Sequence, residues 1–248
     1  MHALTTERTY RRLDLSGVIH RRRLATLLHV FRRLDLPYSG SLAEFGSSNG
    51  FILQTLQREV FDGCRWSFTG FDFDPELLAG GEEKELPRTR FVQFDLNAPH
   101  PEQPAEFDVV LSVETLEHVG NYINGVRNIY AACKPGGIIV IGVPNERGIQ
   151  GLLKYLGRMA YRGPNTYLDF FGDPFHRREY LMALLRDERI DRFRQPPRPL
   201  WHAHLGFDTR IFEQFLRTEL APPKAELLLR HTTGLGFNWF WAFRKNPT

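Results

Sequence analysis

Five short apolar runs, each followed by a stretch long enough for a helix, constrain the fold of this chain more than any other feature. They read SLAEF, RWSFTGFD, TRFVQFD, FDVVLSV and GGIIVIGV, at residues 41–45, 65–72, 89–95, 107–113 and 136–143. Strands that alternate with helices form a parallel sheet with crossover connections. Two stretches, VVL and IIVIGV, are continuously apolar, which is typical of strands covered on both faces. The pattern predicts an α/β fold with a mostly parallel sheet.

The pattern divides the chain into three parts. We expect residues 1–40 to form a basic helical segment, and residues 41–144 together with 207–248 to form the sheet domain. Residues 145–206 read as an insertion, too long for a plain connection, and predict a lid or substrate-binding element. After it, Asp208 is a plausible N-cap for a helix, and AELLLRHT and FNWFWAFRK predict a closing pair of strands.

The first forty residues carry a concentration of arginine. Its members are Arg8, Arg11, Arg12, Arg21, Arg22, Arg23, Arg32 and Arg33. Apolar residues at near-helical spacing between positions 16 and 34 place many of them on a helix. A solvated arginine face is the favoured interpretation. The other is a surface for an anionic partner such as a phosphate, a lipid headgroup or RNA.

The composition excludes several classes of protein. Hydrophobic residues make up 42% and charged residues 25%, with a net charge of +3. The chain has no run of about 18 apolar residues that would span a membrane, and no apolar signal-peptide core. Its two cysteines form neither a disulfide framework nor a metal-ligand spacing. We therefore expect a cytoplasmic protein without a metal. A charge this small argues against a dedicated nucleic-acid binder.

The stretch AEFGSSNG, at residues 43–50, covers the end of the first predicted strand and the turn into the helix that follows. Small residues there let the backbone approach a ligand, and the helix N-terminus offers free N–H groups to an anionic end. Glu44 would repel a pyrophosphate but attract an ammonium or sulfonium. The dinucleotide fingerprint and the P-loop pattern are both absent.

This stretch resembles motif I of the class I S-adenosylmethionine-dependent methyltransferases, acid-x-Gly-x-Gly-x-Gly. Glu44, Gly46 and Gly50 match, and Ser48 replaces the middle glycine. The resemblance covers residues 40–145 well and 204–243 loosely. It implies a doubly wound, Rossmann-like sheet of seven strands with an antiparallel last strand, a helical and aromatic insertion after the fifth strand, and S-adenosyl-L-methionine as the cofactor.

Further motifs of that family follow in order. TGFDFDPELL resembles the end of the second strand, with Asp72 about 20 residues past the glycines, where an acid accepts from the ribose hydroxyls. Taken alone, Asp72 could instead cap the helix that follows. The resemblance places Phe73 against the adenine, Asp95 on its amino group and Leu96 beside the base. The implied cofactor-binding residues are Glu44, Gly46, Ser47, Ser48, Gly50, Asp72, Phe73, Asp95, Leu96 and Val113.

Three histidines are candidates for a catalytic base: His118 after the fourth strand, His176 in the insertion and His204 at its end. A histidine pKa near 6.5 suits proton transfer near neutrality. For His118 the alternative is a residue that fixes its loop, and for the other two an ordinary surface or lid contact. Glu114 and Glu117 are candidates for binding the methionine end of the cofactor or orienting a histidine.

Aromatic residues are frequent in the insertion. They are Tyr155, Tyr161, Tyr167, Phe170, Phe171, Phe175 and Tyr180, and Arg158, Arg162, Arg177 and Arg178 lie among them. The slightly favoured interpretation is a small hydrophobic core of the insertion itself. In the functional interpretation, these residues bind an acceptor molecule that is aromatic or that carries a phosphate or carboxylate.

The resulting hypothesis is a methyltransferase that acts on a small molecule, with oxygen favoured as the acceptor atom. A secondary metabolite, a quinone-like ring or a sugar would fit. The alternatives are an RNA or protein methyltransferase that docks through the arginine-rich helix, and a protein that binds the cofactor without turnover. A nicotinamide dehydrogenase fits less well, because of Glu44 and the broken glycine fingerprint.

Overall fold

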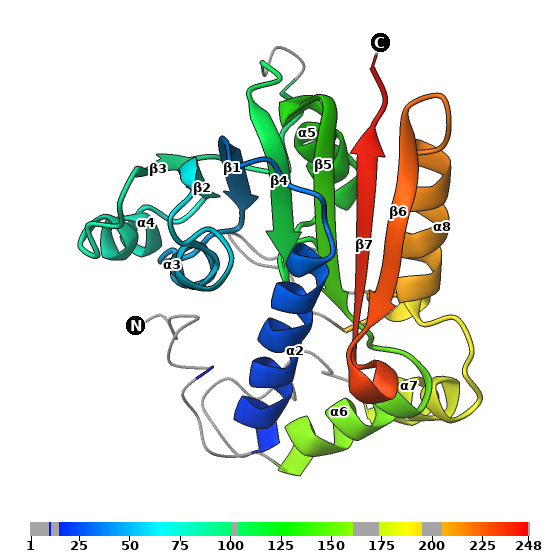
Figure 1. The fold of residues 1–248 in the computed structure, drawn as a ribbon. Helices are drawn as coiled ribbons and strands as arrows, with labels where there is room; N and C mark the ends of the chain where they lie inside the picture. Colours follow the sequence, from blue (N-terminus) through cyan, green and yellow to red (C-terminus); the bar gives the residue numbers. More distant parts are fainter. Residues whose placement is uncertain (1–9, 11–14, 101–103, 161–173, 195–204, 248) are drawn as a thin grey trace.

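The protein is described here as a computed structural model, which covers residues 10, 15–100, 104–160, 174–194 and 205–247. Within these residues, seven strands form one sheet with the order β3-β2-β1-β4-β5-β7-β6 (Figure 1). The strands are β1 (Ser39–Phe45), β2 (Arg65–Asp72), β3 (Thr89–Gln93), β4 (Phe107–Val113), β5 (Cys133–Pro144), β6 (Ala225–Thr232) and β7 (Asn238–Lys245).

The first five strands are parallel, and β7 runs antiparallel to both of its neighbours, β5 and β6. A short connection through the 3₁₀ turn η3 (Gly234–Gly236) joins β6 to β7, as a tight link between antiparallel strands allows. The predicted sheet, with its antiparallel last strand, is confirmed.

Helices cover both faces of the sheet (Figure 1). Helices α2 (Leu15–Arg32) and α3 (Phe51–Glu59) pack on one face, and α5 (Tyr122–Ala132) and α8 (Thr209–Glu219) pack on the other. Successive side chains of a strand point to opposite faces. In β5, Ile138 and Val140 therefore join the core under α2 and α3, while Ile139 and Ile141 join the core under α5 and α8.

Two aspartates cap the N-termini of helices. The Asp208 carboxylate accepts from the backbone N–H groups of Arg210 and Ile211 at the start of α8, which confirms the predicted N-cap. At α4 (Pro75–Glu82), the cap is Asp74. Asp72 is therefore not the cap of α4, which was its structural alternative.

The part of the insertion that the structure describes is helical, as predicted. It contains α6 (Gly148–Ala160), α7 (Pro174–Leu185) and the 3₁₀ turn η2 (Asp191–Phe193). Tyr155 and Tyr180 are buried in a small core with Leu184 and Phe193. These two aromatic residues thus serve the core of the insertion itself. The side chains of the other aromatic candidates, Tyr161, Tyr167, Phe170, Phe171 and Phe175, lie outside the described part of the chain.

A buried ion pair fastens this insertion to the sheet domain. Arg147 Nε lies 3.4 Å from Asp208 Oδ2, and both side chains are almost completely buried. Asp208 also accepts from the backbone N–H of Ile190, and Arg147 donates to the backbone oxygen of Asp187 at 2.6 Å. The division of the chain at residues 40, 144 and 206 stays a prediction. Among the described helices, none has the length and apolar character needed to cross a membrane.

Candidate functional site

The site is built where β1, β2 and β4 end. The strand order places β1 between β2 and β4. The connection from β3 to β4 crosses to the other half of the sheet, so the topological switch point lies between β1 and β4. In open α/β sheets, ligands bind beyond the carboxyl ends of the strands at such a switch point. The turn at residues 46–50 leaves β1 at this edge, and the loops after β2 and β4 flank it.

The turn after β1 depends on its small residues. Gly46 has φ 81°, and a Cβ there would lie 2.1 Å from Thr115 Oγ1, so both conformation and packing require glycine. Gly50, with φ 69°, would meet the ring of Phe91 in the same way. Ser48 also has a positive φ of 49°, a conformation that glycine adopts more easily. The departure from the family motif is therefore accommodated within the same turn.

Asp72 closes this turn from the neighbouring strand. Its Oδ2 accepts a hydrogen bond of 2.8 Å from the backbone N–H of Ser48, and its Oδ1 accepts from the N–H of Asp74 at 3.1 Å. The backbone N–H groups of Gly46 and Ser47 both donate to the Phe71 oxygen. Asp72 is 7% exposed, and burial raises the pKa of its carboxyl. The turn and the end of β2 thus form one hydrogen-bonded unit.

Glu44 is a buried acid in the last part of β1. It is 1% exposed, and neither carboxylate oxygen has a hydrogen-bond partner among the described residues. Burial raises the pKa of this carboxyl well above its usual value, and the charge of Asp72 adds to the rise. The nearby backbone N–H of Leu53 opposes the rise, although its geometry does not make a hydrogen bond. The hydroxyl of Ser47 and the side-chain oxygen of Asn49 are likewise buried without partners in that part of the chain. Such acceptors fit a ligand that brings N–H donors and positive charge.

The remaining predicted cofactor residues surround this unit in different ways. Phe73 is exposed, and its backbone oxygen accepts from Gln93 Nε2 at 3.0 Å. Asp95 is exposed, and its Oδ1 accepts from the backbone and side-chain nitrogens of Asn97. Leu96 and Val113 are buried in the two cores on opposite faces of the sheet. Their roles toward the cofactor stay predictions.

An acidic loop follows β4. Glu114 has φ 54°, and its carboxylate pairs with Arg23 and accepts from Asn238 Nδ2 at 2.6 Å. Glu117 is fully buried, and burial followed by the charge of Glu114 raises its pKa well above the usual value. His118 Nε2 lies 4.0 Å from Glu117 Oε1, and the His118 side chain is 23% exposed. His118 is therefore reachable by a substrate at the carboxyl edge of the sheet.

The other two histidine candidates cannot be placed. His176 lies in α7, but its side chain is outside the described part of the chain, and His204 is outside it altogether. Both stay predictions from the sequence.

Three residues at this edge were not assigned to the cofactor site from the sequence. Arg23 and Tyr10 are buried and hydrogen-bonded to each other, and Asn238 reaches Glu114 from β7. One signal for Arg23 was present, because positions 23, 27 and 30 follow the helical spacing of the buried face of α2. No comparable signal marks Tyr10 or Asn238.

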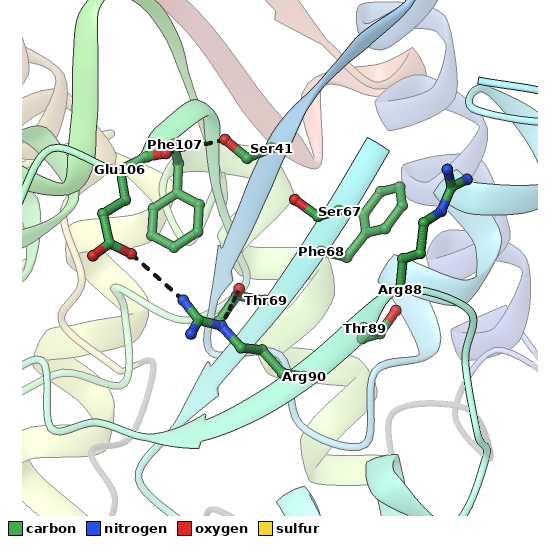
Figure 2. A pocket seen from close by; sticks show the side chains of 9 residues that line it. All are labelled: Ser41, Ser67, Phe68, Thr69, Arg88, Thr89, Arg90, Glu106 and Phe107. Atoms are coloured by element: carbon green, nitrogen blue, oxygen red, sulfur yellow. Dashed lines mark hydrogen bonds and ion pairs between the residues drawn. The ribbon is translucent and has the colours of Figure 1, made fainter. Parts of the chain in front are cut away.

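A separate cavity of about 510 Å³ opens at the opposite edge of the sheet (Figure 2). It is lined by Ser41, Ser67, Phe68, Thr69, Arg88, Thr89, Arg90, Glu106 and Phe107. Arg90 already bonds Thr69 and pairs with Glu106 across it. These residues come from the amino-terminal ends or middle of their strands, so this cavity is not part of the site around Glu44.

Comparison with known proteins identifies the family of this arrangement. Residues 18–188 match the family described as "Methyltransferase domain". A ubiquinone biosynthesis O-methyltransferase of Methylococcus capsulatus is 30% identical over 136 residues, 51% of this chain and 55% of that protein. A trans-aconitate 2-methyltransferase of Paracidovorax citrulli is 29% identical over 118 residues, 48% of this chain and 44% of that protein. The chain thus spans about half the length of these curated relatives.

The fold also has counterparts among solved structures. A magnesium protoporphyrin IX methyltransferase from Synechocystis, solved with bound S-adenosylhomocysteine, superposes with a TM-score of 0.60 at 12% identity. The alignment covers 97% of this chain and 92% of that chain. The family match covers more than half of the chain, and the order of the seven strands is that of the methyltransferase fold. The chain belongs to the class I S-adenosylmethionine-dependent methyltransferase family.

Proposed function

We propose that this protein transfers a methyl group from S-adenosylmethionine to an oxygen of a small-molecule acceptor. The observation that carries the proposal is the buried carboxylate of Glu44, without hydrogen-bond partners in the described residues, beside the turn that Asp72 closes. A buried acid without a partner is costly unless a ligand supplies the missing donors. The amino group of S-adenosylmethionine supplies such donors together with a positive charge.

The other groups of the site match the remaining parts of this cofactor. Asp72 uses its oxygens for two backbone N–H groups, but each carboxylate oxygen has a second lone pair that can accept from a ribose hydroxyl. Phe73, with its ring partly exposed, follows Asp72 directly and is available to pack on the adenine. Asp95 and Leu96 follow the next strand, β3, and complete the adenine end in this proposal.

The chemistry requires alignment more than acid–base assistance. S-adenosylmethionine supplies an activated methyl group whose leaving group is a neutral thioether. The task of the protein is to hold the acceptor oxygen in line with that methyl and to exclude water. When the acceptor is a hydroxyl, a base must also take its proton. His118 fits that role because it is partly exposed at the carboxyl edge, with Glu117 behind it.

The choice of a small-molecule acceptor rests on the named activities of the relatives and on the contacts that the N-terminal arginines make in the structure. The two curated relatives are named for a ubiquinone-pathway reaction and for trans-aconitate, both small molecules. The alternative, docking to RNA, depends on the arginine-rich helix, which includes Arg21 and Arg23. Arg23 is buried in an ion pair, and Arg21 donates to the backbone oxygen of Tyr10 at 3.3 Å. These contacts leave less free positive charge than the sequence suggests.

Calorimetric titration of the full chain with S-adenosylhomocysteine tests cofactor binding. Asp72→Ala should weaken the affinity by about tenfold or more, because the ribose loses an ionised hydrogen-bond acceptor. Asp108→Ala is the matched control, since Asp108 is a carboxylate of the same sheet at the opposite edge, paired with Lys134. Equal affinity in wild type and Asp72→Ala would overturn the ribose assignment.

Transfer itself is tested with S-adenosylmethionine that carries a labelled methyl group. The protein is incubated with fractions of small molecules, RNA and protein from a bacterial extract. Label in the small-molecule fraction, absent with Glu44→Gln, supports the proposal. Label confined to RNA or protein would overturn the acceptor class, and bound cofactor without any labelled product would favour a binding protein.

A further inference from the structure

Arg23 in helix α2 is buried at the edge of the proposed cofactor site. Its side chain is 6% exposed, and its guanidinium forms an ion pair with Glu114. Its Nε and Nη2 both donate to the hydroxyl of Tyr10, at 3.1 and 2.8 Å. One guanidinium thus joins the segment before α2 to the loop after β4.

The far end of this network is fixed as well. Glu114 accepts a hydrogen bond of 2.6 Å from Asn238 Nδ2, at the start of β7. Asn238 is itself buried, and its backbone N–H donates to the hydroxyl of Thr233. Arg23 is therefore held by a loop that is itself bonded to β7, and these contacts fix the position of its guanidinium beside Tyr10.

Tyr10 lies beside the turn that follows β1. Its ring centre is 4.9 Å from that of Phe51, the first residue of α3. Burial raises the pKa of the Tyr10 hydroxyl, and the charges of Glu114 and Glu44 add to this rise while Arg23 opposes it. The ring contact with Phe51 places Tyr10 next to the turn after β1, the strand that carries the group proposed to bind the cofactor ammonium.

The hydrogen bonding of Tyr10 indicates what its hydroxyl can bind. A phenol oxygen has one hydrogen to donate and lone pairs that accept. Arg23 occupies the lone pairs, so the hydroxyl is left with its donor function. A hydroxyl that accepts from a cation is polarised and becomes a stronger donor. Its best partner is an anionic oxygen, and the amino-acid end of S-adenosylmethionine carries a carboxylate.

We propose that Tyr10 donates its hydroxyl hydrogen to the carboxylate of S-adenosylmethionine, and that Arg23 is the positioning residue that holds Tyr10 there. The inference rests on the proposed function and deepens it. Glu44 would then bind the ammonium and Tyr10 the carboxylate of the same amino-acid end. Helix α2 becomes part of the methyl-transfer site rather than a docking surface.

A purely structural role for Arg23 is the competing explanation. Buried ion pairs contribute little net stability compared with apolar residues of similar volume. An ion pair kept at the edge of the cofactor turn is therefore better explained by positioning than by stability. The two explanations make different predictions for binding. Loss of a positioning residue should weaken binding only of a cofactor that carries the carboxylate, whereas loss of a structural residue should weaken binding of any cofactor.

The experiment compares S-adenosylmethionine with its decarboxylated analogue, which keeps the ammonium and lacks the carboxylate. Both are titrated calorimetrically into wild type, Tyr10→Phe, Arg23→Ala, Arg23→Lys and Arg22→Ala. Wild type should prefer the carboxylate-bearing cofactor by about tenfold or more. Tyr10→Phe, which keeps the ring on Phe51, should remove that preference and leave affinity for the analogue unchanged.

The arginine variants separate positioning from folding. Arg23→Ala should remove the preference in the same way, and Arg23→Lys should restore it only partly because one ammonium cannot fork to two partners. Arg22→Ala, a neighbour that is exposed on the same helix, should behave as wild type. If Arg23→Ala does not fold, Tyr10→Phe decides alone.

Three results would overturn the inference. These are equal loss of both ligands in Tyr10→Phe, no loss of either, or a wild type without preference for the carboxylate. A wild type that binds neither ligand would instead remove the proposed function itself, so the two failures are distinguishable.

Discussion

The backbone N–H of Ser48 donates a hydrogen bond of 2.8 Å to Oδ2 of Asp72, which joins the turn after β1 to the end of β2. This bond lies between two segments that carry different parts of the family motif. It holds Ser48 in a left-handed conformation that a serine adopts at some cost. The site is therefore ordered before a ligand arrives, and its weak points can be tested one at a time.

Gly46→Ala should destabilise the protein more than the same change at another left-handed glycine. At Gly46 the new Cβ would lie 2.1 Å from Thr115 Oγ1, whereas at Gly63, with φ 72°, it would meet nothing within 4 Å. Gly63→Ala therefore measures backbone strain alone, about 1 kcal/mol. Gly46→Ala should cost about 1–3 kcal/mol more in the free energy of unfolding, measured in urea. Equal costs for the two variants would show that Thr115 moves aside freely.

Glu44→Gln should stabilise the ligand-free protein near neutral pH while it weakens cofactor binding. Burial raises the pKa of Glu44 in the folded protein well above its ordinary value. Below the ordinary pKa, the carboxyl is protonated in both the folded and the unfolded chain and has no effect on stability. As the pH rises between the two pKa values, the unfolded chain releases its proton more readily, so the folded state loses stability.

The measurement is the midpoint of thermal unfolding at about pH 5 and about pH 8, with and without S-adenosylhomocysteine. Glu44→Gln should unfold at a higher temperature than wild type at the higher pH, with a smaller difference at the lower one. Ligand should stabilise wild type more than the variant. A variant that is less stable than wild type at both pH values would mean that the carboxylate already has a partner in the folded state.

His118→Ala should lower the rate of methyl transfer by about 100-fold, within the range for removal of a general base. Affinity for S-adenosylhomocysteine should stay close to wild type, because His118 lies on the loop after β4 rather than on the turn after β1. The check is kcat with the identified acceptor together with calorimetry. Wild-type kcat in the variant would assign His118 to fixing its loop.

Asp208→Ala should destabilise the protein by about 2–4 kcal/mol, because it removes the buried carboxylate beside Arg147, whose other acidic partner is the exposed Asp187, and it also removes the cap of α8. Asp191→Ala is the control, since Asp191 pairs with Arg189 at the surface and its loss should change little. Chemical denaturation of both variants measures the difference. Similar stability for the two would mean that the Arg147–Asp208 pair is not needed to hold the insertion on the sheet.

Much of the site could be located from the sequence because its parts are local. Glu44, Gly46 and Ser48 belong to one turn, and Asp72 ends the next strand. In a parallel sheet the ends of neighbouring strands meet, so the hydrogen bond between Ser48 and Asp72 follows from strand order. The N-cap at Asp208 is local in the same sense. The roles of these residues toward a ligand stay predictions that the experiments above address.

The arginine-rich segment shows why other features could not be predicted. Counting charges favoured a solvated face, yet Arg23 is buried while Arg22 beside it is exposed. The difference depends on which face of α2 packs on the sheet. That in turn depends on the loop after β4 supplying Glu114 as a partner.

The sequence by itself determined the alternation of strands and helices and the edge of the sheet that carries the cofactor motifs, because periodicity and turn chemistry act over a few residues. Only the tertiary structure decided that Tyr10, Arg23, Glu114 and Asn238 form one network. Glu114 and Asn238 are 124 positions apart, and no local pattern encodes a contact over that separation. Charge pairs of this kind form only where packing removes water from both partners, and packing is a property of the whole fold.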